Sequence, residues 1–361
     1  MALSGCGRDG SSRQAETVPG SGVVGSAVAV GEPGHGVGGI AVGEGAVWVG
    51  TWDRRGGIVL RLDQESGEPV QTVRVPHGGG DVTVAPGAVW TAGVVCVGRH
   101  PEDPEDVCLT EPRVSRIDPA SGRVVATIRI PLPPGVGRDT ALPSGVAVAD
   151  GAVWVAVSWD ARTGEVLRID PRTNAIAARI QTGGFVGELR PGAGSLWVLS
   201  HREYTDETKV KGASLLRIDK STNEVVATPI REELSLLGGD LIPPVLAAGE
   251  DAVWVTSPTA AHPRQAFRVD TETNQAAREQ LPVERFYPVA VDADAIWFIG
   301  STGHGATLAR LDPRTLEQTS GTQLPIAAVR TAHDPSTDSL WIASLVNRHN
   351  ERARVVRVKL P

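Results

Sequence analysis

Several residue types are scarce in this chain of 361 residues. Aromatic side chains make up 4% of it, and it has only three cysteines and one methionine. It contains no 18 consecutive apolar residues, which argues against a transmembrane helix. The net charge is −7 and the basic residues form no run, which argues against nucleic acid as a partner. The catalytic motifs GxSxG and HExxH are absent as well.

Glycine and proline are abundant, at 42 and 26 residues, as in chains that join many short strands by tight turns. A short apolar strand with a central tryptophan recurs seven times. Four of the six intervals between these tryptophans are 42 to 44 residues long. A strand-based period in the forties predicts a β-propeller with one blade per repeat. The seven tryptophans are Trp48, Trp90, Trp154, Trp197, Trp254, Trp297 and Trp341.

A second phrase, Arg-Leu/Ile/Val-Asp, ends the third strand of six units. In one of them, EVLRIDPRTN at residues 165–174, the polar residues resemble a phosphate or metal site. The phrase also predicts a tight turn, because Asp accepts backbone N–H bonds and Asn or Gly four residues later adopts positive φ. A functional site would occur once, so we interpret the phrase as structural. Its aspartates are Asp63, Asp118, Asp170, Asp219, Asp270 and Asp312.

The sequence therefore predicts an all-β fold, a seven-bladed β-propeller with four strands per blade. Residues 24–361 form this single domain, and we expect it to be a monomer. The seventh unit ends after its third strand, near Lys359, so residues 26–30 are expected to supply its outer strand. That N-terminal strand would close the ring and leave no free sheet edge.

Residues 1–23 indicate a location outside the cytoplasm. Leu3-Ser4-Gly5-Cys6 resembles a bacterial lipobox, in which the cysteine, here Cys6, becomes lipidated. The polar, Gly/Ser-rich residues that follow suit a flexible tether. We therefore predict a membrane contact through a lipid anchor alone. The alternative is a chance LSGC in a disordered tail.

The other two cysteines, Cys96 and Cys108, flank a polar loop and match no metal-binding spacing. We predict a disulfide between them, worth roughly 3 kcal/mol in the chain-entropy model. Such a bond persists only in an oxidising compartment. Two free thiols that never meet are the alternative.

Alignment on the tryptophans predicts which residues face the central channel. Three charged residues are among them: Asp81, Glu188 and Arg330. Charges are rarely left unpaired at a narrow mouth. They could pair with one another, or the two carboxylates could bind a cation and Arg330 an anionic ligand.

In a four-stranded blade, the loops between strands two and three share one face with the links between blades. We call this the long-loop face, and its longest segments are residues 93–112, 201–212 and 231–244. Long, irregular segments favour function. Seven of the eight histidines map to this face, either by composition or to build a metal or acid–base site. The candidates there are His35, His77, His201 and His304, with the aromatic residues Trp52, Trp159 and Tyr287, which are either exposed for a sugar or peptide or covered.

The repeat resembles two families of bacterial propellers over nearly the whole chain. RIDPRTNAIAARI at residues 168–180 is similar to the YVTN/NHL-type repeat. GEGAVW, ADGAVW and GEDAVW are similar to a blade phrase of the streptogramin lyases, the virginiamycin B lyase family. Those lyases eliminate across an ester with a histidine base and a carboxylate-bound Mg²⁺. The resemblance implies a base among His35, His77, His201 and His304, and a metal ligand in Glu188 or Glu203.

We therefore expect a lipid-anchored, extracytoplasmic propeller that binds a small molecule, glycan or protein through its long-loop face. The alternative is a metal-dependent lyase or hydrolase of the streptogramin-lyase type, with Mg²⁺ or Ca²⁺ at the same face. The shared motifs are structural, so they specify the fold rather than an activity.

Overall fold

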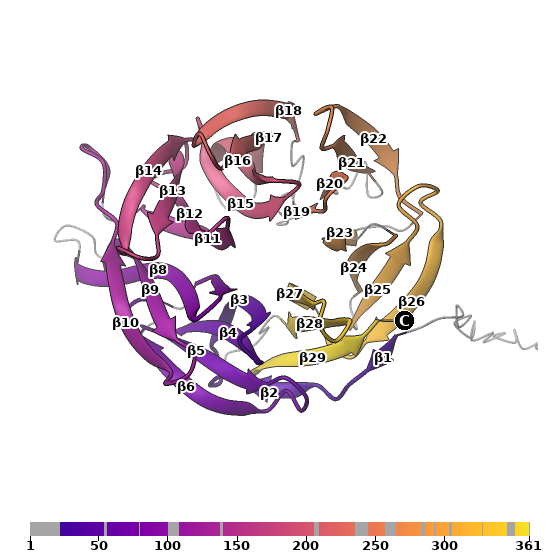
Figure 1. Cartoon of the computed structure of the whole chain (residues 1–361), viewed down its shortest axis with the longest axis horizontal. Helices are drawn as coiled ribbons and strands as arrows, with labels where there is room; N and C mark the ends of the chain where they lie inside the picture. Colours follow the sequence, from indigo (N-terminus) through magenta and orange to yellow (C-terminus); the bar gives the residue numbers. More distant parts are fainter. Residues whose placement is uncertain are drawn as a thin grey trace, which may run out of the picture.

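A computed structural model gives the fold (Figure 1). It describes residues 22–53, 56–78, 80–99, 108–137, 140–205, 209–234, 245–256, 265–282, 286–291, 294–302, 305–326, 328–344 and 351–360. All secondary-structure elements within these residues are β-strands. Within these ranges, no helix has the length and hydropathy needed to cross a membrane.

The strands form seven antiparallel sheets, which are the blades of a β-propeller. Blade 1 has β3 (Gly36–Gly43), β4 (Ala46–Asp53), β5 (Gly56–Asp63) and β6 (Pro69–Val75). Blade 2 has β7 (Val82–Ala85), β8 (Ala88–Arg99), β9 (Cys108–Asp118) and β10 (Arg123–Arg129). Blade 3 has β11 (Leu142–Ala149), β12 (Ala152–Ser158), β13 (Gly164–Asp170) and β14 (Ala175–Gln181).

The second half of the ring repeats this order. Blade 4 has β15 (Phe185–Gly192), β16 (Ser195–Thr205), β17 (Lys209–Asp219) and β18 (Glu224–Leu234). Blade 5 has β19 (Val245–Ala248), β20 (Ala252–Thr256), β21 (Gln265–Asp270) and β22 (Ala276–Gln280). Blade 6 has β23 (Phe286–Val291), β24 (Ile296–Thr302), β25 (Gly305–Leu311) and β26 (Gln318–Leu324). Blade 7 has β27 (Ala328–Asp334), β28 (Ser339–Ser344) and β29 (Ala353–Lys359), with β1 (Val23–Val24) and β2 (Val28–Val30) on its outer edge.

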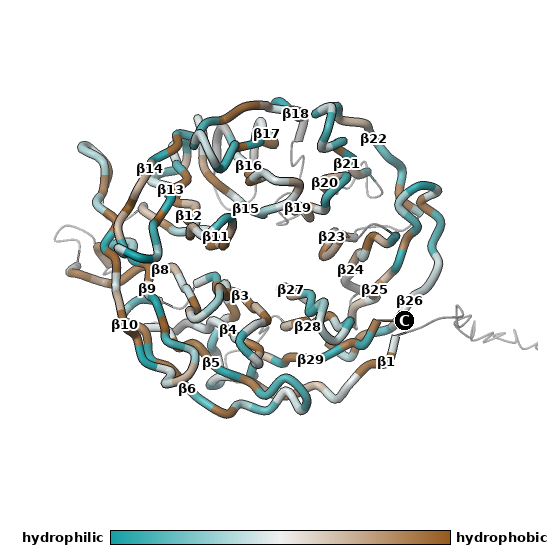
Figure 2. The backbone as a smooth tube through the Cα atoms, viewed as in Figure 1, coloured by the Kyte–Doolittle hydropathy of each residue, from teal (hydrophilic) through white to brown (hydrophobic). Residues whose placement is uncertain are grey.

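The first strand of each blade lies nearest the central axis and the last strand lies at the rim (Figure 1). The second strand is buried on both faces; in β12 every residue is buried. The seven repeat tryptophans sit at the centre of these strands and are at most 4% exposed. Hydrophobic and hydrophilic stretches alternate along the outer strands, as expected of strands with one covered face (Figure 2).

The cores lie between adjacent blades rather than within one sheet. Trp90 of blade 2, for example, packs in one cluster with Val155 and Leu167 of blade 3. A sheet buries its faces only against its neighbours in this arrangement, so every blade depends on the next for stability.

The turn prediction is confirmed. Asp170 accepts hydrogen bonds from the backbone N–H of Arg172, at 2.8 Å, and through its carbonyl from Asn174, also at 2.8 Å. Asn174 has a φ of 55°. The backbone N–H donors lower the pKa of the Asp170 carboxyl. In the sixth turn Leu316 takes the same position with a φ of 59°, although leucine rarely adopts that conformation.

The arginine at this strand position, which in blade 7 is Arg357 of Arg-Val-Lys, contacts a tryptophan and in three blades also joins the next blade. In six blades its guanidinium lies 5.3 to 5.9 Å from the ring centroid of the tryptophan in its own blade, within cation–π range. In three of these it also donates to a carbonyl in the Asp turn of the following blade. These bonds are Arg116 to Pro171 at 2.7 Å, Arg217 to Thr271 at 2.6 Å and Arg357 to Gln64 at 3.3 Å. We call this the arginine lock.

The predicted closure of the ring is confirmed. Val28 of β2 pairs with Val355 of β29, and Val23 of β1 pairs with Lys359. The N-terminal and C-terminal ends of the described chain therefore share one sheet (Figure 1). Gly22 also donates to the Thr322 hydroxyl of blade 6 at 3.0 Å.

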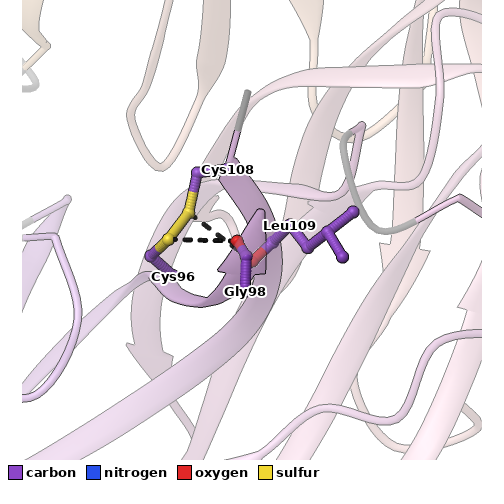
Figure 3. The surroundings of a disulfide bond; sticks show 4 residues. All are labelled: Cys96, Gly98, Cys108 and Leu109. Atoms are coloured by element: carbon purple, nitrogen blue, oxygen red, sulfur yellow. Dashed lines mark hydrogen bonds between the residues drawn. A yellow bond between two sulfur atoms is a disulfide. The ribbon is translucent and has the colours of Figure 1, made fainter. Parts of the chain in front are cut away.

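Two of the expected long loops are instead extended hairpins. β8 and β9 stay paired from Trp90–Arg116 out to Arg99–Cys108 and project beyond the rim (Figure 1). The predicted disulfide joins Cys96 and Cys108 near the tip, with their Cα atoms 5.6 Å apart (Figure 3). β16 and β17 pair as far as Thr205–Lys209 in the same way. Segments that read as polar loops are therefore arms of the sheet, because neighbouring backbones satisfy each other's hydrogen bonds.

Candidate functional site

Asp81 precedes β7 at the inner edge of blade 2, where the sequence placed it. One carboxylate oxygen accepts a hydrogen bond from its neighbour Val82 at 3.0 Å. The other accepts from the backbone N–H of Val146 in blade 3, at 3.1 Å. A side chain on Gly39 of blade 1 would collide with this carboxylate, since its Cβ would lie 2.3 Å from the nearer oxygen. Asp81 therefore sits at the contact of three inner strands and joins two of them.

Glu188 and Arg330 do the same elsewhere in the ring. The Glu188 carboxylate accepts a hydrogen bond from the backbone N–H of Leu246 in blade 5, at 2.8 Å. It also forms an ion pair with Arg190 of its own strand, at 2.5 Å. Arg330 of blade 7 donates to the carbonyl of Gly38 in blade 1 at 2.8 Å. Each of the three predicted charged residues thus bonds to the backbone of the following blade.

A repeated irregularity lies at Glu188 and Arg330, whereas the described strands of blade 2, which holds Asp81, pair without it. The register of the first two strands shifts by one residue in five blades, as in a β-bulge, which redirects a side chain at a sheet edge. In blade 4 the shift falls between Val186 and Glu188. The corresponding shifts end at Gly39, Gly145, Ala290 and Arg330.

His77 lies in the link between blades 1 and 2 and is 1% exposed. Its Nδ1 donates to the Gly78 carbonyl at 2.9 Å, and its Nε2 accepts from the Ser115 hydroxyl at 3.0 Å. Burial and the charge of Arg113 lower the pKa of His77, while the bond to Gly78 opposes them. Both ring nitrogens are therefore occupied by bonds within blade 2 and its link.

His201 on β16 is also 1% exposed. Its ring packs against Phe185 and against Gly187, where a side chain would collide with Nε2. Within the described residues Nδ1 has no hydrogen-bond partner. Burial lowers the pKa of His201 to about 4, so the ring is neutral at pH 7.

Two buried carboxylates were missed in the sequence. Glu165 on β13 is 1% exposed and bonds to Arg179 at 2.5 Å and to Gln181 at 3.1 Å. Burial raises the pKa of Glu165, and the Arg179 charge opposes that rise. Glu111 on β9 forms ion pairs with Arg113 and Arg129. The sequence pattern that could have predicted these two buried carboxylates is a glutamate near the start of a third strand with an arginine on the fourth. Buried charges are usually paired in this way.

The remaining predicted residues are spread over the ring. Trp159 is 2% exposed and packs between blades 2 and 3, so it is covered rather than presented at a mouth. His35 lies in the segment before β3. Trp52 lies in strand β4, Glu203 in β16 and Tyr287 in β23, but the structure does not describe their side chains. His304 and Cys6 lie outside the described residues. Within the described part of the chain, no three His, Cys, Asp or Glu side chains form a metal-binding group.

A cavity of about 420 Å³ opens on the opposite face, where the short turns lie. We call it the blade 5 cavity. It lies where blades 4, 5 and 6 meet, and Trp254 and Arg268 of blade 5 form part of its wall. Other lining residues include Gly249, Glu250, Asp251, Val291, Pro313 and Arg314. The predicted site was on the long-loop face, and a cavity on the short-turn face was not predicted.

Comparison with known proteins identifies the fold. A scan against protein-family models finds no match, and a search of curated proteins finds none either. Hydrazine synthase of Kuenenia stuttgartiensis is a structural neighbour at 15% identity, with a TM-score of 0.63 and coverage of 93% of this chain and 99% of that one. The polysaccharide lyase Uly1 is another, at 10% identity, with a TM-score of 0.58 and coverage of 90% and 89%. At these identities the likeness establishes a seven-bladed β-propeller, and the resemblance to the YVTN/NHL and streptogramin-lyase repeats stays a prediction.

Proposed function

We propose that this protein is a non-catalytic binding propeller that acts outside the cytoplasm and engages a protein or glycan through its long-loop face. The observation that carries the proposal is the β8–β9 arm, which extends the strand two to strand three connection of that face beyond the rim (Figure 1) and is fixed by the Cys96–Cys108 disulfide. Val97, beside the disulfide, is 42% exposed. A covalently fixed, partly apolar arm is preorganised for binding.

The other features of the long-loop face support binding over catalysis. Asp81, Glu188 and Arg330 are bonded to neighbouring blades, and His77 is bonded within blade 2 and its link. These groups hold the ring together, which leaves the arm to meet a partner. The disulfide supports an oxidising compartment. Lipid attachment at Cys6 would then hold the propeller at the membrane surface.

A photo-crosslinking amino acid at position 97 tests the binding proposal in the native host. Val226 on β18 is 54% exposed and provides a matched control on the rim of another blade. We expect one discrete adduct from position 97, none of that size from position 226, and loss of the adduct when both cysteines are replaced by serine. Identical adducts from both positions would refute the arm as the binding element.

One observation favours a second candidate, a metal-dependent lyase or hydrolase. His201 is neutral at pH 7 with an unpartnered nitrogen within the described residues, and Glu188 lies on the adjacent strand. Thermal unfolding in EDTA and then in Mg²⁺, Mn²⁺, Ca²⁺ or Zn²⁺ tests it, because a ligand at 100 times its dissociation constant adds about 2.7 kcal/mol. A shift that disappears in Glu188→Gln would favour the lyase; no shift with any metal would remove it.

A further inference from the structure

The blade 5 cavity coincides with a change in the turn between the first two strands of that blade. In blades 1, 3 and 4 this turn has two successive residues at positive φ, of which the second is glycine, such as Asp150 and Gly151. In blade 5 the turn is Glu250-Asp251, and neither residue has positive φ. The Thr271 hydroxyl and backbone N–H instead donate to the carbonyls of Glu250 and Asp251, at 2.6 and 3.2 Å. The Glu250-Asp251 turn therefore differs in conformation from the turns of blades 1, 3 and 4. Its residues line the cavity.

Among the described residues, the arginine of blade 5 makes neither the cation–π contact found in the other six blades nor the forward bond found in blades 2, 4 and 7. Arg268 occupies the lock position of blade 5, and Pro313 holds the place in blade 6 that Pro171 holds in blade 3. Both Arg268 and Pro313 line the cavity. Among the described residues, Arg268 has no hydrogen bond, ion pair or ring contact, and its charge interacts with that of Asp270. The cavity therefore opens beside the one repeat arginine that, within the described chain, does not lie over the tryptophan of its own blade.

Trp254 supplies a second uncommitted donor. It is fully buried, lines the cavity and packs edge-on against Phe298 at 6.3 Å. In three other blades the indole N–H donates to the carbonyl five residues earlier, for example Trp154 to Ala149 at 3.3 Å. For Trp254 that residue is Gly249, and within the described chain the indole N–H has no partner, as also holds for Trp90 and Trp341.

The charges around the cavity restrict what it can accept. Arg268 and Arg314 are cationic, whereas Glu250 and Asp251 are exposed acidic residues on the same lining. A carboxylate suits a guanidinium because it accepts two parallel N–H bonds. A ligand with several negative charges would be repelled by Glu250 and Asp251. Val291, Pro313 and the Trp254 ring offer apolar surface beside the arginine.

We propose that the blade 5 cavity is a binding site for a small monocarboxylate with an aromatic or apolar body. Its carboxylate pairs with Arg268, and its body fills the space beside Val291 and Pro313. The volume lies in the range of ordinary ligand pockets. This site is on the face opposite the β8–β9 arm, so it stands apart from the function proposed above.

Equilibrium dialysis with 2-naphthoate tests the proposal, with 2-naphthamide and 2-naphthylmethylammonium as neutral and cationic matches. We expect saturable binding of the naphthoate and weaker binding of both others. Arg268→Met keeps the aliphatic stem and should weaken naphthoate binding about tenfold or more, since it removes a hydrogen bond to a charged group. Arg310→Met is the matched control: it occupies the same repeat position, over Trp297 at 5.9 Å.

Two further variants keep the test decisive if Arg268→Met folds poorly. Arg314→Gln changes an exposed cationic side chain and should weaken binding. Glu250→Gln removes a like charge and should tighten it. Absence of naphthoate binding, equal binding of the ammonium compound, or equal losses in Arg268→Met and Arg310→Met would each overturn the proposal.

Discussion

The carboxylate of Glu188 in blade 4 accepts a hydrogen bond from the backbone N–H of Leu246 in blade 5, at 2.8 Å. This side chain, 15% exposed, also pairs with Arg190. An inner-strand charge thus joins two sheets that share no backbone ladder. The role of Glu188 that this bond supports is to hold blades 4 and 5 in register.

Glu188→Ala should therefore lower the free energy of unfolding by about 1.5–3 kcal/mol, the usual worth of hydrogen bonds to a charged group. Glu188→Gln keeps an acceptor oxygen and should lose less. Urea denaturation at pH 7 gives these values, and exposed Glu224→Ala on β18 is the control, expected within about 0.5 kcal/mol of wild type. Equal effects of the two alanine variants would contradict the inter-blade role.

Stability should fall in acid because of His201. Its pKa is lowered from 6.5 to about 4 by burial. As the pH falls, the unfolded chain takes up this proton first, so the contribution is fully present above pH 6.5 and is lost on the way down to pH 4. The expected loss is about 3 kcal/mol.

Urea midpoints measured at steps between pH 7.5 and pH 4 test this dependence on His201. His201→Gln should be less stable at pH 7 yet show a flatter pH dependence over this window than wild type. The prediction fails if the two proteins have parallel profiles.

Reduction of the Cys96–Cys108 disulfide should loosen the β8–β9 arm. The cysteines are 12 residues apart, and the chain-entropy model assigns a loop of this size roughly 3 kcal/mol. Hydrogen exchange should quicken for amides 94–99 after reduction or in the double serine variant. The β16–β17 arm, which the disulfide does not touch, is the internal reference and should exchange at an unchanged rate.

Truncation at the N-terminus should separate the tether from the ring closure. Removal of residues 1–21 leaves β1 and β2 in place and should leave the thermal midpoint unchanged. Removal of residues 1–31 takes both strands from β29 and exposes a sheet edge, which invites association between chains. We expect a lower midpoint and larger species by light scattering for the longer truncation; similar behaviour of the two would count against the closing strand.

The fold could be predicted because its determinants are local and repeated. The spacing of the tryptophans predicted the seven blades, the Asp phrase predicted the turns, and the missing outer strand of the last unit predicted the closure of the ring. Each of these signals is a short stretch of sequence, and each prediction is confirmed. The inner-edge positions of Asp81, Glu188 and Arg330 followed from the same alignment. Their partners did not, because Val146, Leu246 and Gly38 are backbone groups of other blades that no side-chain pattern marks.

The blade 5 cavity was missed for a different reason. Arg268 carries the same phrase as the other lock arginines, so its sequence context looks ordinary. The departure lay in GEDAVW, where Asp251 stands in place of the glycine of GEGAVW and ADGAVW. A single missing turn glycine changes the course of the backbone, and its effect on packing against the neighbouring blades could be seen only in three dimensions.

The arginine lock bears on how such a chain could have arisen. Six units carry in one phrase both the arginine that can reach forward and the turn that can receive the arginine from behind, and the bond itself forms from blades 2, 4 and 7. A duplicated gene segment encoding one unit would therefore bring matching contacts for both of its new neighbours. Growth by tandem copying needs no coordinated change elsewhere, and once the ring is complete individual copies are free to diverge.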